Sequence, residues 1–199
     1  MALELNGTTG VSLVQDGVVT AADLNSTLDL SGKTVTLPAG VGGKVLQVVQ
    51  VVSTTTATYS NSRTWNSMTS FLQASITPSS SSSKVFVMLN LGKVHNVNGV
   101  NLRIIRNGSA LLIGDASGSR PRTQTAVTSG FNGDINHADG GTLLYLDSPA
   151  TTSSTTYSFE AYSEASGATY FNRSIADPDD TIQYAARGAS SIILMEIGA

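Results

Sequence analysis

The chain has 199 residues, which allows one well-packed core or one domain with an extension and excludes a large multidomain enzyme. Charged residues make up 13% of the chain, and the net charge is -3, so no basic field is available for a phosphate backbone and we expect no nucleic-acid binding. The chain has no cysteine, which excludes disulfides, thiolate metal sites and a cysteine nucleophile.

The N-terminal sequence Met1–Asn6 has neither a basic region nor an apolar region of the kind found in export signals. No apolar run reaches the length of a membrane span. We therefore expect a soluble chain made in a cytoplasm, without membrane insertion.

Residues 1–43 contain short apolar groups separated by glycines, and none is long enough to build a core. Thr20–Asp23 has the spacing of a capping box and predicts a short helix over residues 21–28. Residues 30–40 then indicate a turn, a short strand and a Pro-Gly stop. The pattern predicts an N-terminal anchor or stalk over 1–43, followed by a domain over 44–199.

From Lys44 onward the sequence is typical of β-structure. The valine-rich run Val45–Val52 predicts a strand covered on both faces. Tyr157–Tyr162 alternates strictly and places Tyr157, Phe159 and Ala161 on one face. Further strands are expected within 65–77, with Met68, Leu72 and Ile76 pointing inward, and at 84–91, 143–146, 168–173 and 191–197.

The clearest local signal is Asn107-Gly108 between two apolar runs, which predicts a tight hairpin over Leu102–Ile113. A two-residue loop would pair Arg106 with Ser109, Ile104 with Leu111 and Leu102 with Ile113. Eight or nine short strands with almost no helix predict an all-β fold, an antiparallel β-sandwich of jelly-roll type.

The sequence matches none of the catalytic motifs that it superficially resembles. Gly40–Lys44 resembles a phosphate loop, but Val45 stands where Ser or Thr would hold magnesium. His95 and His137 lack the spacing of a zinc pair and lie in expected loops, so a Ser-His-Asp triad is not indicated either. Asp177–Asp180 could supply calcium ligands, although a solvated turn is the simpler interpretation. We expect no enzyme, no metal and no cofactor.

The long segment Gly114–Gly141 is the best candidate for binding, because loops on a rigid β-scaffold concentrate binding sites. The candidate receptor-binding residues are Arg120, Arg122, Phe131 and His137; the alternative is a loop that packs on its own subunit or a neighbour. Trp65 with Tyr59 could form a platform for a sugar ring, or Trp65 could be a buried plug of the sandwich.

Residues 28–40 and 43–49 resemble the junction between stalk and head in fibre and appendage proteins of tailed bacteriophages. Residues 75–87 and 102–108 are similar to the head region of the same proteins. The head layout is also loosely similar to the trimeric jelly roll of tumour-necrosis-factor (TNF) and C1q-like domains, an analogy that carries no function by itself.

The resemblance implies a homotrimeric protein of the virion surface, bound to other virion proteins through its N-terminus. Three copies around an axis would bury Leu28, Leu30, Val35 and Leu37 together. The near absence of a shaft favours a short spike, head fibre or capsid decoration over a complete tail fibre. Its head would attach the virion to a host-surface glycan or protein; the alternatives are a decoration or cement protein without receptor binding, and, less favoured, a depolymerase.

Overall fold

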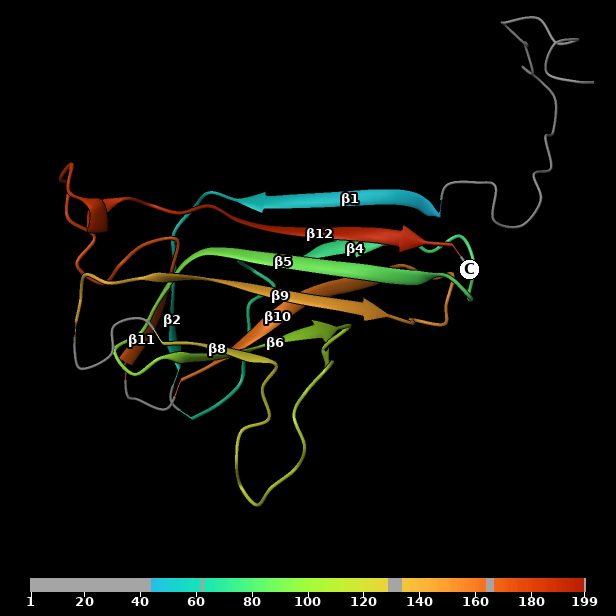
Figure 1. Cartoon of the computed structure of the whole chain (residues 1–199), viewed down its shortest axis with the longest axis horizontal. Helices are drawn as coiled ribbons and strands as arrows, with labels where there is room; N and C mark the ends of the chain where they lie inside the picture. Colours follow the sequence, from blue (N-terminus) through green and yellow to red (C-terminus); the bar gives the residue numbers. More distant parts are fainter. Residues whose placement is uncertain (1–43, 62, 129–133, 164–166, 199) are drawn as a thin grey trace, which may run out of the picture. The chain divides into compact units, whose positions relative to one another are not determined.

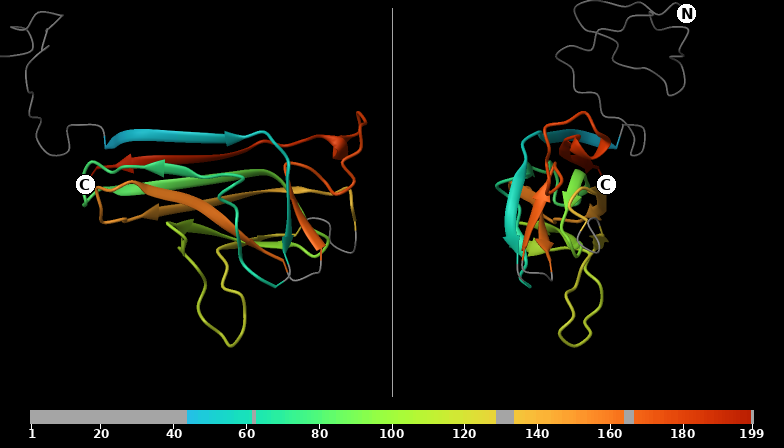
Figure 2. Two further views of the ribbon diagram at one scale, coloured as in Figure 1. Left: turned by 180° about the vertical axis from the view of Figure 1, so that it is seen from behind. Right: turned by 90° about the vertical axis from the view of Figure 1, so that its left-hand side faces the viewer.

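The computed structural model describes residues 44–61, 63–128, 134–163 and 167–198, and over these residues the chain is all-β with antiparallel sheets (Figures 1 and 2). No helix within these ranges is long and apolar enough to cross a membrane. The predictions for residues 1–43, including the helix at 21–28 and the contacts of Leu28, Leu30, Val35 and Leu37, lie outside the described residues. Phe131 does too.

The first sheet has the strand order β1-β12-β5-β11-β2, and β9 also pairs with β5. Because β5 is long, its body pairs with β12 and β9 while its last residues pair with β11, and this sheet curls (Figure 2). Its strands are β1 (Val45–Ser53), β2 (Ala57–Asn61), β5 (Lys84–His95), β9 (Asp139–Asp147), β11 (Gly167–Phe171) and β12 (Ser190–Ile197).

The second sheet has the order β3-β10-β6-β7, with β4 pairing to β10 and β8 to β6. Its strands are β3 (Asn66–Ser67), β4 (Ala74–Ile76), β6 (Val100–Arg106), β7 (Ser109–Ala110), β8 (Thr125–Val127) and β10 (Thr155–Tyr162). A single 3-10 turn, η3 (Gln183–Ala185), precedes β12 among the described residues.

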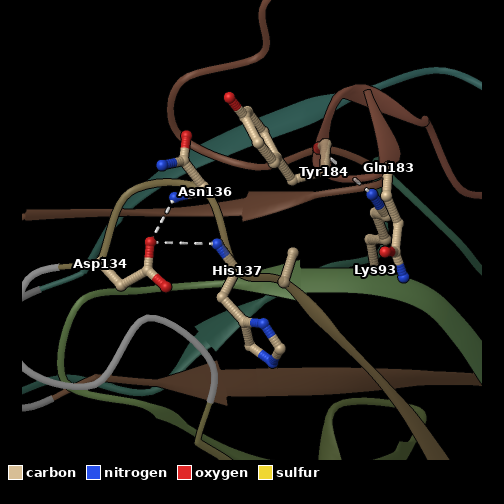
Figure 3. A pocket seen from close by; sticks show the side chains of 7 residues that line it. Lys93, Asp134, Asn136, His137, Gln183 and Tyr184 are labelled. Carbon is tan, nitrogen blue, oxygen red and sulfur yellow. Dashed lines mark hydrogen bonds between the residues drawn. The ribbon is translucent and has the colours of Figure 1, made fainter. Parts of the chain in front are cut away.

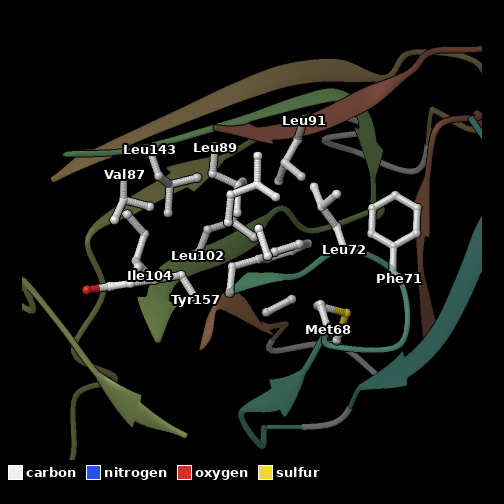
Figure 4. Packing of buried hydrophobic residues seen from close by; sticks show 14 of the residues in the cluster. Met68, Phe71, Leu72, Val87, Leu89, Leu91, Leu102, Ile104, Leu143 and Tyr157 are labelled. Atoms are coloured by element: carbon white, nitrogen blue, oxygen red, sulfur yellow. The ribbon is translucent and has the colours of Figure 1, made fainter. Parts of the chain in front are cut away.

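Alternation decides which side chains enter the core between the sheets. Tyr157, Phe159 and Ala161 of β10 are fully buried, as predicted. The expected inward positions Met68, Leu72 and Ile76 are buried as well. They contact the apolar face of the first sheet, to which β5 contributes alternate residues (Figure 4). The buried cluster includes Val85, Val87, Leu89, Leu91, Leu143, Ile192 and Leu194.

The expected hairpin forms at Asn107-Gly108, where both residues have positive φ, 47° and 82°. Arg106 pairs with Ser109 as predicted, and the amide of Leu111 donates to the carbonyl of Ile104. The predicted pairing of Leu102 with Ile113 is wrong, because Leu102 pairs with Thr125 of β8. The chain leaves the ribbon where Leu112 takes a φ of 43°.

A buried polar group joins the two sheets. Arg106 Nη1 donates to both carboxylate oxygens of Asp147, at 3.0 and 2.8 Å, and Tyr157 Oη donates to the same carboxylate at 2.7 Å. Burial raises the pKa of Tyr157, and the hydrogen bond to Asp147 raises it further, so the hydroxyl stays protonated. The contact fixes β9 of the first sheet against β6 and β10 of the second.

One strand prediction is wrong in a way that matters for function. Val45–Ser53 forms β1, but its outer face is open and its inner face is only partly covered, since Val51 is still 37% exposed. Val48 and Val52 point away from the second sheet and are more than half exposed. A smaller departure is that β5 continues beyond the strand expected at 84–91, so that His95 lies at the end of a strand and not in a loop.

Candidate functional site

The outer face of β1, β12, β5 and β9 carries apolar side chains on all four strands, next to a polar row formed by Ser191, Asn90 and Thr142. Antiparallel partners directly opposite one another share a face, so the pairings define two rows across this face. One row is Val48, Met195, Phe86 and Leu146; the other is Gln50, Ile193, Met88 and Leu144. Gln50 is the one polar member, and we call the other seven residues the outer apolar face.

The outer apolar face is open to solvent in the single chain. Val48 is 57% exposed, Leu144 48% and Leu146 47%. Lys84 is the charged neighbour of these two rows on β5, and the next charges on these strands that are not buried, Lys93 of β5 and Asp139 of β9, lie toward the other end of the sheet. Ile197 lies beside Lys84 and extends the apolar surface toward the chain end.

The size of this surface can be judged from sheet geometry. One residue on one face of a sheet covers about 4.8 by 6.6 Å, so the seven apolar residues project onto roughly 220 Å². The largest apolar patch of a typical monomer covers about 300–600 Å², so exposure and the free strand edge, rather than size, distinguish this face. Among the described residues β1 pairs only with β12, so an apolar strand edge is also left unpaired. An exposed sheet of this kind is suited to pack against another protein surface.

A second feature is a polar hollow of about 470 Å³, lined by Lys93, Asp134, Asn136, His137, Ala138, Gln183 and Tyr184 (Figure 3). The residues come from three separate segments: the end of β5, the loop 134–138 before β9, and η3. We call this hollow the end pocket. It lies at the opposite end of β5 from Lys84, which pairs with Ile197 near the last described residue.

The loop 134–138 is held by its own aspartate. Asp134 Oδ1 accepts hydrogen bonds from the amides of Asn136, at 2.9 Å, and His137, at 3.4 Å. The bond from Asn136 lowers the pKa of Asp134, so this carboxylate is charged at neutral pH. His137 Nε2 lies 3.0 Å from Asp139 Oδ1, and both side chains are largely exposed.

The segment that carries η3 is held by an ion pair and by the opposite loop. Arg187 donates to both carboxylate oxygens of Asp177, at 3.1 and 2.6 Å. The amide of Ala176 donates to the carbonyl of Ile135 at 3.1 Å, which ties the two walls of the end pocket together.

Asn172, fully buried at the end of β11, connects this segment to the sheet. Its amide donates to the carbonyl of Lys93 at 2.8 Å, and its carbonyl accepts from Gly188 at 3.0 Å. Its side chain donates to the carbonyls of Ser53 and Thr55 and accepts from the Ser190 hydroxyl. The end pocket therefore rests on a rigid base.

His95 lies behind the pocket, fully buried, with its ring edge against Tyr170. Neither ring nitrogen has a well-formed hydrogen bond within the described ranges, although the backbone of Asp134 lies near it. Burial lowers the pKa of His95, and the nearby Asp134 and Asp139 only partly oppose this. The imidazole is therefore neutral at pH 7.

The structure separates the candidate residues that the sequence grouped in one segment. His137 lines the end pocket, whereas Arg120 and Arg122 are in the protruding loop 111–124 and do not line it (Figure 1). Both arginines bond within their own loop: Arg120 to Ser117 and Arg122 Nε to the carbonyl of Gly114. Phe131 lies outside the described residues.

Trp65 and Tyr59 do not form a common platform. Trp65 packs against Tyr162. The guanidinium of Arg103 lies over the Trp65 ring, 3.8 Å from the ring centroid, and also forms an ion pair with Glu160. Trp65 is partly exposed rather than a buried plug. Tyr59 instead meets Phe171 edge-on. These aromatics contribute to packing.

The sequence left open a calcium site at 177–180. In the structure the Asp177 carboxylate forms ion pairs with Arg187 and Arg173 instead. No group of three or more potential ligand side chains in the described part of the chain is placed to hold a metal ion.

Comparison of the sequence with models of known protein families gives no match, and comparison with curated proteins gives no significant match.

Proposed function

We propose that this chain is a structural protein of a bacteriophage virion, a short homotrimeric fibre or spike on the capsid or tail that assists adhesion to the host surface. Residues 44–199 would be the displayed head, and residues 1–43 would anchor it to other virion proteins.

The observation that carries self-association is the outer apolar face. A monomer in water would leave Val48, Leu144 and Leu146 about half exposed in one continuous sheet surface. Burying one such side chain fully is worth about 1.5–3 kcal/mol, so covering both rows is strongly favourable. In a closed ring of three copies, this face of one copy would pack against a different surface of the next copy, and the two rows would bring no charge into that contact.

The topology supports the finer assignment of a TNF/C1q-like jelly roll. The first and last major strands, β1 and β12, pair in one sheet, and β12 is followed by β5 and β9. The other sheet places β10 between β6 and the pair β3 and β4. This interleaving of early and late strands is the arrangement expected of a jelly roll, and the threefold symmetry is taken from the resemblance.

The two ends of the described domain favour adhesion over decoration alone. The amide of Gly198 donates to the carbonyl of Lys44 at 2.7 Å, so both ends of the described chain meet at one end of the sandwich. The end pocket is at the other end of β5, roughly 30 Å away along nine residues of strand. A head anchored through residue 44 presents this pocket outward.

The test is the mass in solution of the full-length protein and of residues 44–199, measured by multi-angle light scattering at micromolar concentration. We expect a trimer for the full chain, and a trimer for the shorter chain if the outer apolar face suffices. A monomeric full-length protein would contradict the proposal.

A further inference from the structure

We propose that the end pocket is a carbohydrate site that binds one neutral pyranose unit of a surface glycan. The inference deepens the proposed function and rests on it for its biological meaning, since it names the ligand of a displayed head. The pocket itself is built within one chain, so its chemistry can be tested apart from assembly.

The hydrogen-bonding groups of the end pocket match a sugar. The side-chain amides of Asn136 and Gln183 both line it, and neither has a hydrogen-bond partner within the described ranges. A primary amide offers two donors and an acceptor in one plane. Neighbouring sugar hydroxyls both donate and accept, so each amide can bond two of them at once.

Tyr184 supplies the apolar contact that a pyranose ring requires. Its side chain is 41% exposed although it is a large aromatic, and it lines the hollow beside Gln183 (Figure 3). The tyrosine ring is flat and apolar, and its hydroxyl group is polar. It can therefore contact the C–H face of a sugar ring and hydrogen-bond to the sugar hydroxyls.

The charges of the end pocket favour a neutral ligand. Lys93 is the cation among the lining residues, and Asp134 offers a carboxylate in the same hollow. His137 lies beside Asp139. A phosphate or carboxylate ligand would be attracted by Lys93 but repelled by the charged Asp134. A neutral polyol can donate a hydrogen bond to Asp134 and accept one from Lys93.

Both walls are fixed before any ligand arrives. Asp134 orders the loop 134–138, the ion pair of Asp177 with Arg187 orders the segment before β12, and the Ala176–Ile135 bond joins them. A rigid site loses little conformational entropy on binding, which matters for a small ligand with few contacts. Three such pockets on one trimer would add avidity on a repetitive glycan.

The experiment uses the full-length protein on an array of immobilised neutral sugars: glucose, galactose, mannose, rhamnose and N-acetylglucosamine. The array also carries sialic acid, a sulfated disaccharide and unrelated peptides. Gln183→Ala and Tyr184→Ala are compared with the wild type and with Gln73→Ala, a matched control because Gln73 is an exposed glutamine outside the pocket. The mass of each protein in solution is measured on the same samples.

We expect binding to at least one neutral pyranose, reduced about tenfold or more by Gln183→Ala and by Tyr184→Ala and unchanged by Gln73→Ala. The proposal is overturned by wild-type protein that binds no neutral sugar, that binds only anionic sugars or peptides, or whose sugar binding survives both pocket variants. A monomeric protein that still binds the sugar through Gln183 and Tyr184 would contradict the trimer and leave the pocket assignment standing.

Discussion

Glu196 shows how this chain buries a charged group by means of neutral hydrogen-bond donors. Glu196 of β12 is 1% exposed and has no cation beside it among the described residues. Its carboxylate accepts hydrogen bonds from the Ser79 hydroxyl at 2.6 Å, the Ser79 amide at 2.7 Å and the Gln47 side chain at 2.7 Å. Neutral donors therefore hold an ionised group inside the fold.

These bonds make stability depend on pH. Burial raises the pKa of Glu196, but the hydrogen bonds from Ser79 and Gln47 outweigh it and lower the pKa to about 2. A carboxyl group with a depressed pKa stabilises the fold above its unfolded value of 4.5, and this contribution is lost as pH falls toward 2. The window for Glu196 is thus about pH 5 to 2.

We predict that Glu196→Gln lowers the free energy of unfolding at pH 7 by roughly 1–3 kcal/mol, the value of hydrogen bonds to a charged group. It should also flatten the loss of stability between pH 5 and 2. Urea unfolding at several pH values measures both effects. Asp115→Asn, in an exposed loop, is the control and should change neither; an equally steep acid transition in Glu196→Gln would refute the assignment.

Among the elements, those with a clear local pattern could be predicted from the sequence. β10 alternates strictly, and Asn107-Gly108 demands a tight turn, so both form as expected. The prediction that both faces of β1 are covered was wrong, because a strand buried on both faces and a strand with an open apolar face can have the same valine-rich composition. The path after Leu112 could not be predicted, since Leu102 finds a partner at Thr125.

The candidate site was predicted only in part. His137 belongs to the end pocket, but Lys93, Gln183 and Tyr184 come from distant parts of the chain and no sequence spacing connects them. Their proximity depends on Asn172, which bonds to the carbonyls of Lys93 and Ser53 and to the Ser190 side chain. Such long-range contacts leave no local pattern in the sequence. The nearest sequence feature is Asn172 itself, a polar residue near the end of the strand expected at 168–173.

Close packing of two elements at the base of the end pocket gives a second prediction. A Cβ on Gly92 of β5 would clash with the carbonyl oxygen of Ala189, just before β12. Since that neighbour is backbone, the strand must move. We predict that Gly92→Ala destabilises the fold by about 1–3 kcal/mol, as overpacking does.

Thermal and urea unfolding measure this loss. Gly114→Ala is the matched control, because the nearest atom to its added Cβ is 3.8 Å away. The control should unfold like the wild type. If Gly92→Ala were as stable as Gly114→Ala, the close approach of β5 to the start of β12 would be disproved.

At the scale of the whole described domain, the outer apolar face and the two ends of the domain differ in chemistry. The outer apolar face is open to solvent, one end of the described domain carries both described chain ends, and the opposite end carries the polar end pocket. Loss of assembly and loss of ligand binding should therefore be separable, because the residues of the outer apolar face and of the end pocket do not overlap.

The most direct measurement is the mass, by sedimentation equilibrium, of full-length Leu144→Lys beside Leu112→Lys. The two leucines are 48% and 52% exposed, but Leu112 lies in the loop 111–124 away from the outer apolar face. A buried, unpaired lysine costs several kcal/mol, so we predict that Leu144→Lys weakens the trimer about a hundredfold or more and that Leu112→Lys remains trimeric. Trimers of equal affinity in both variants would contradict assembly through the outer apolar face.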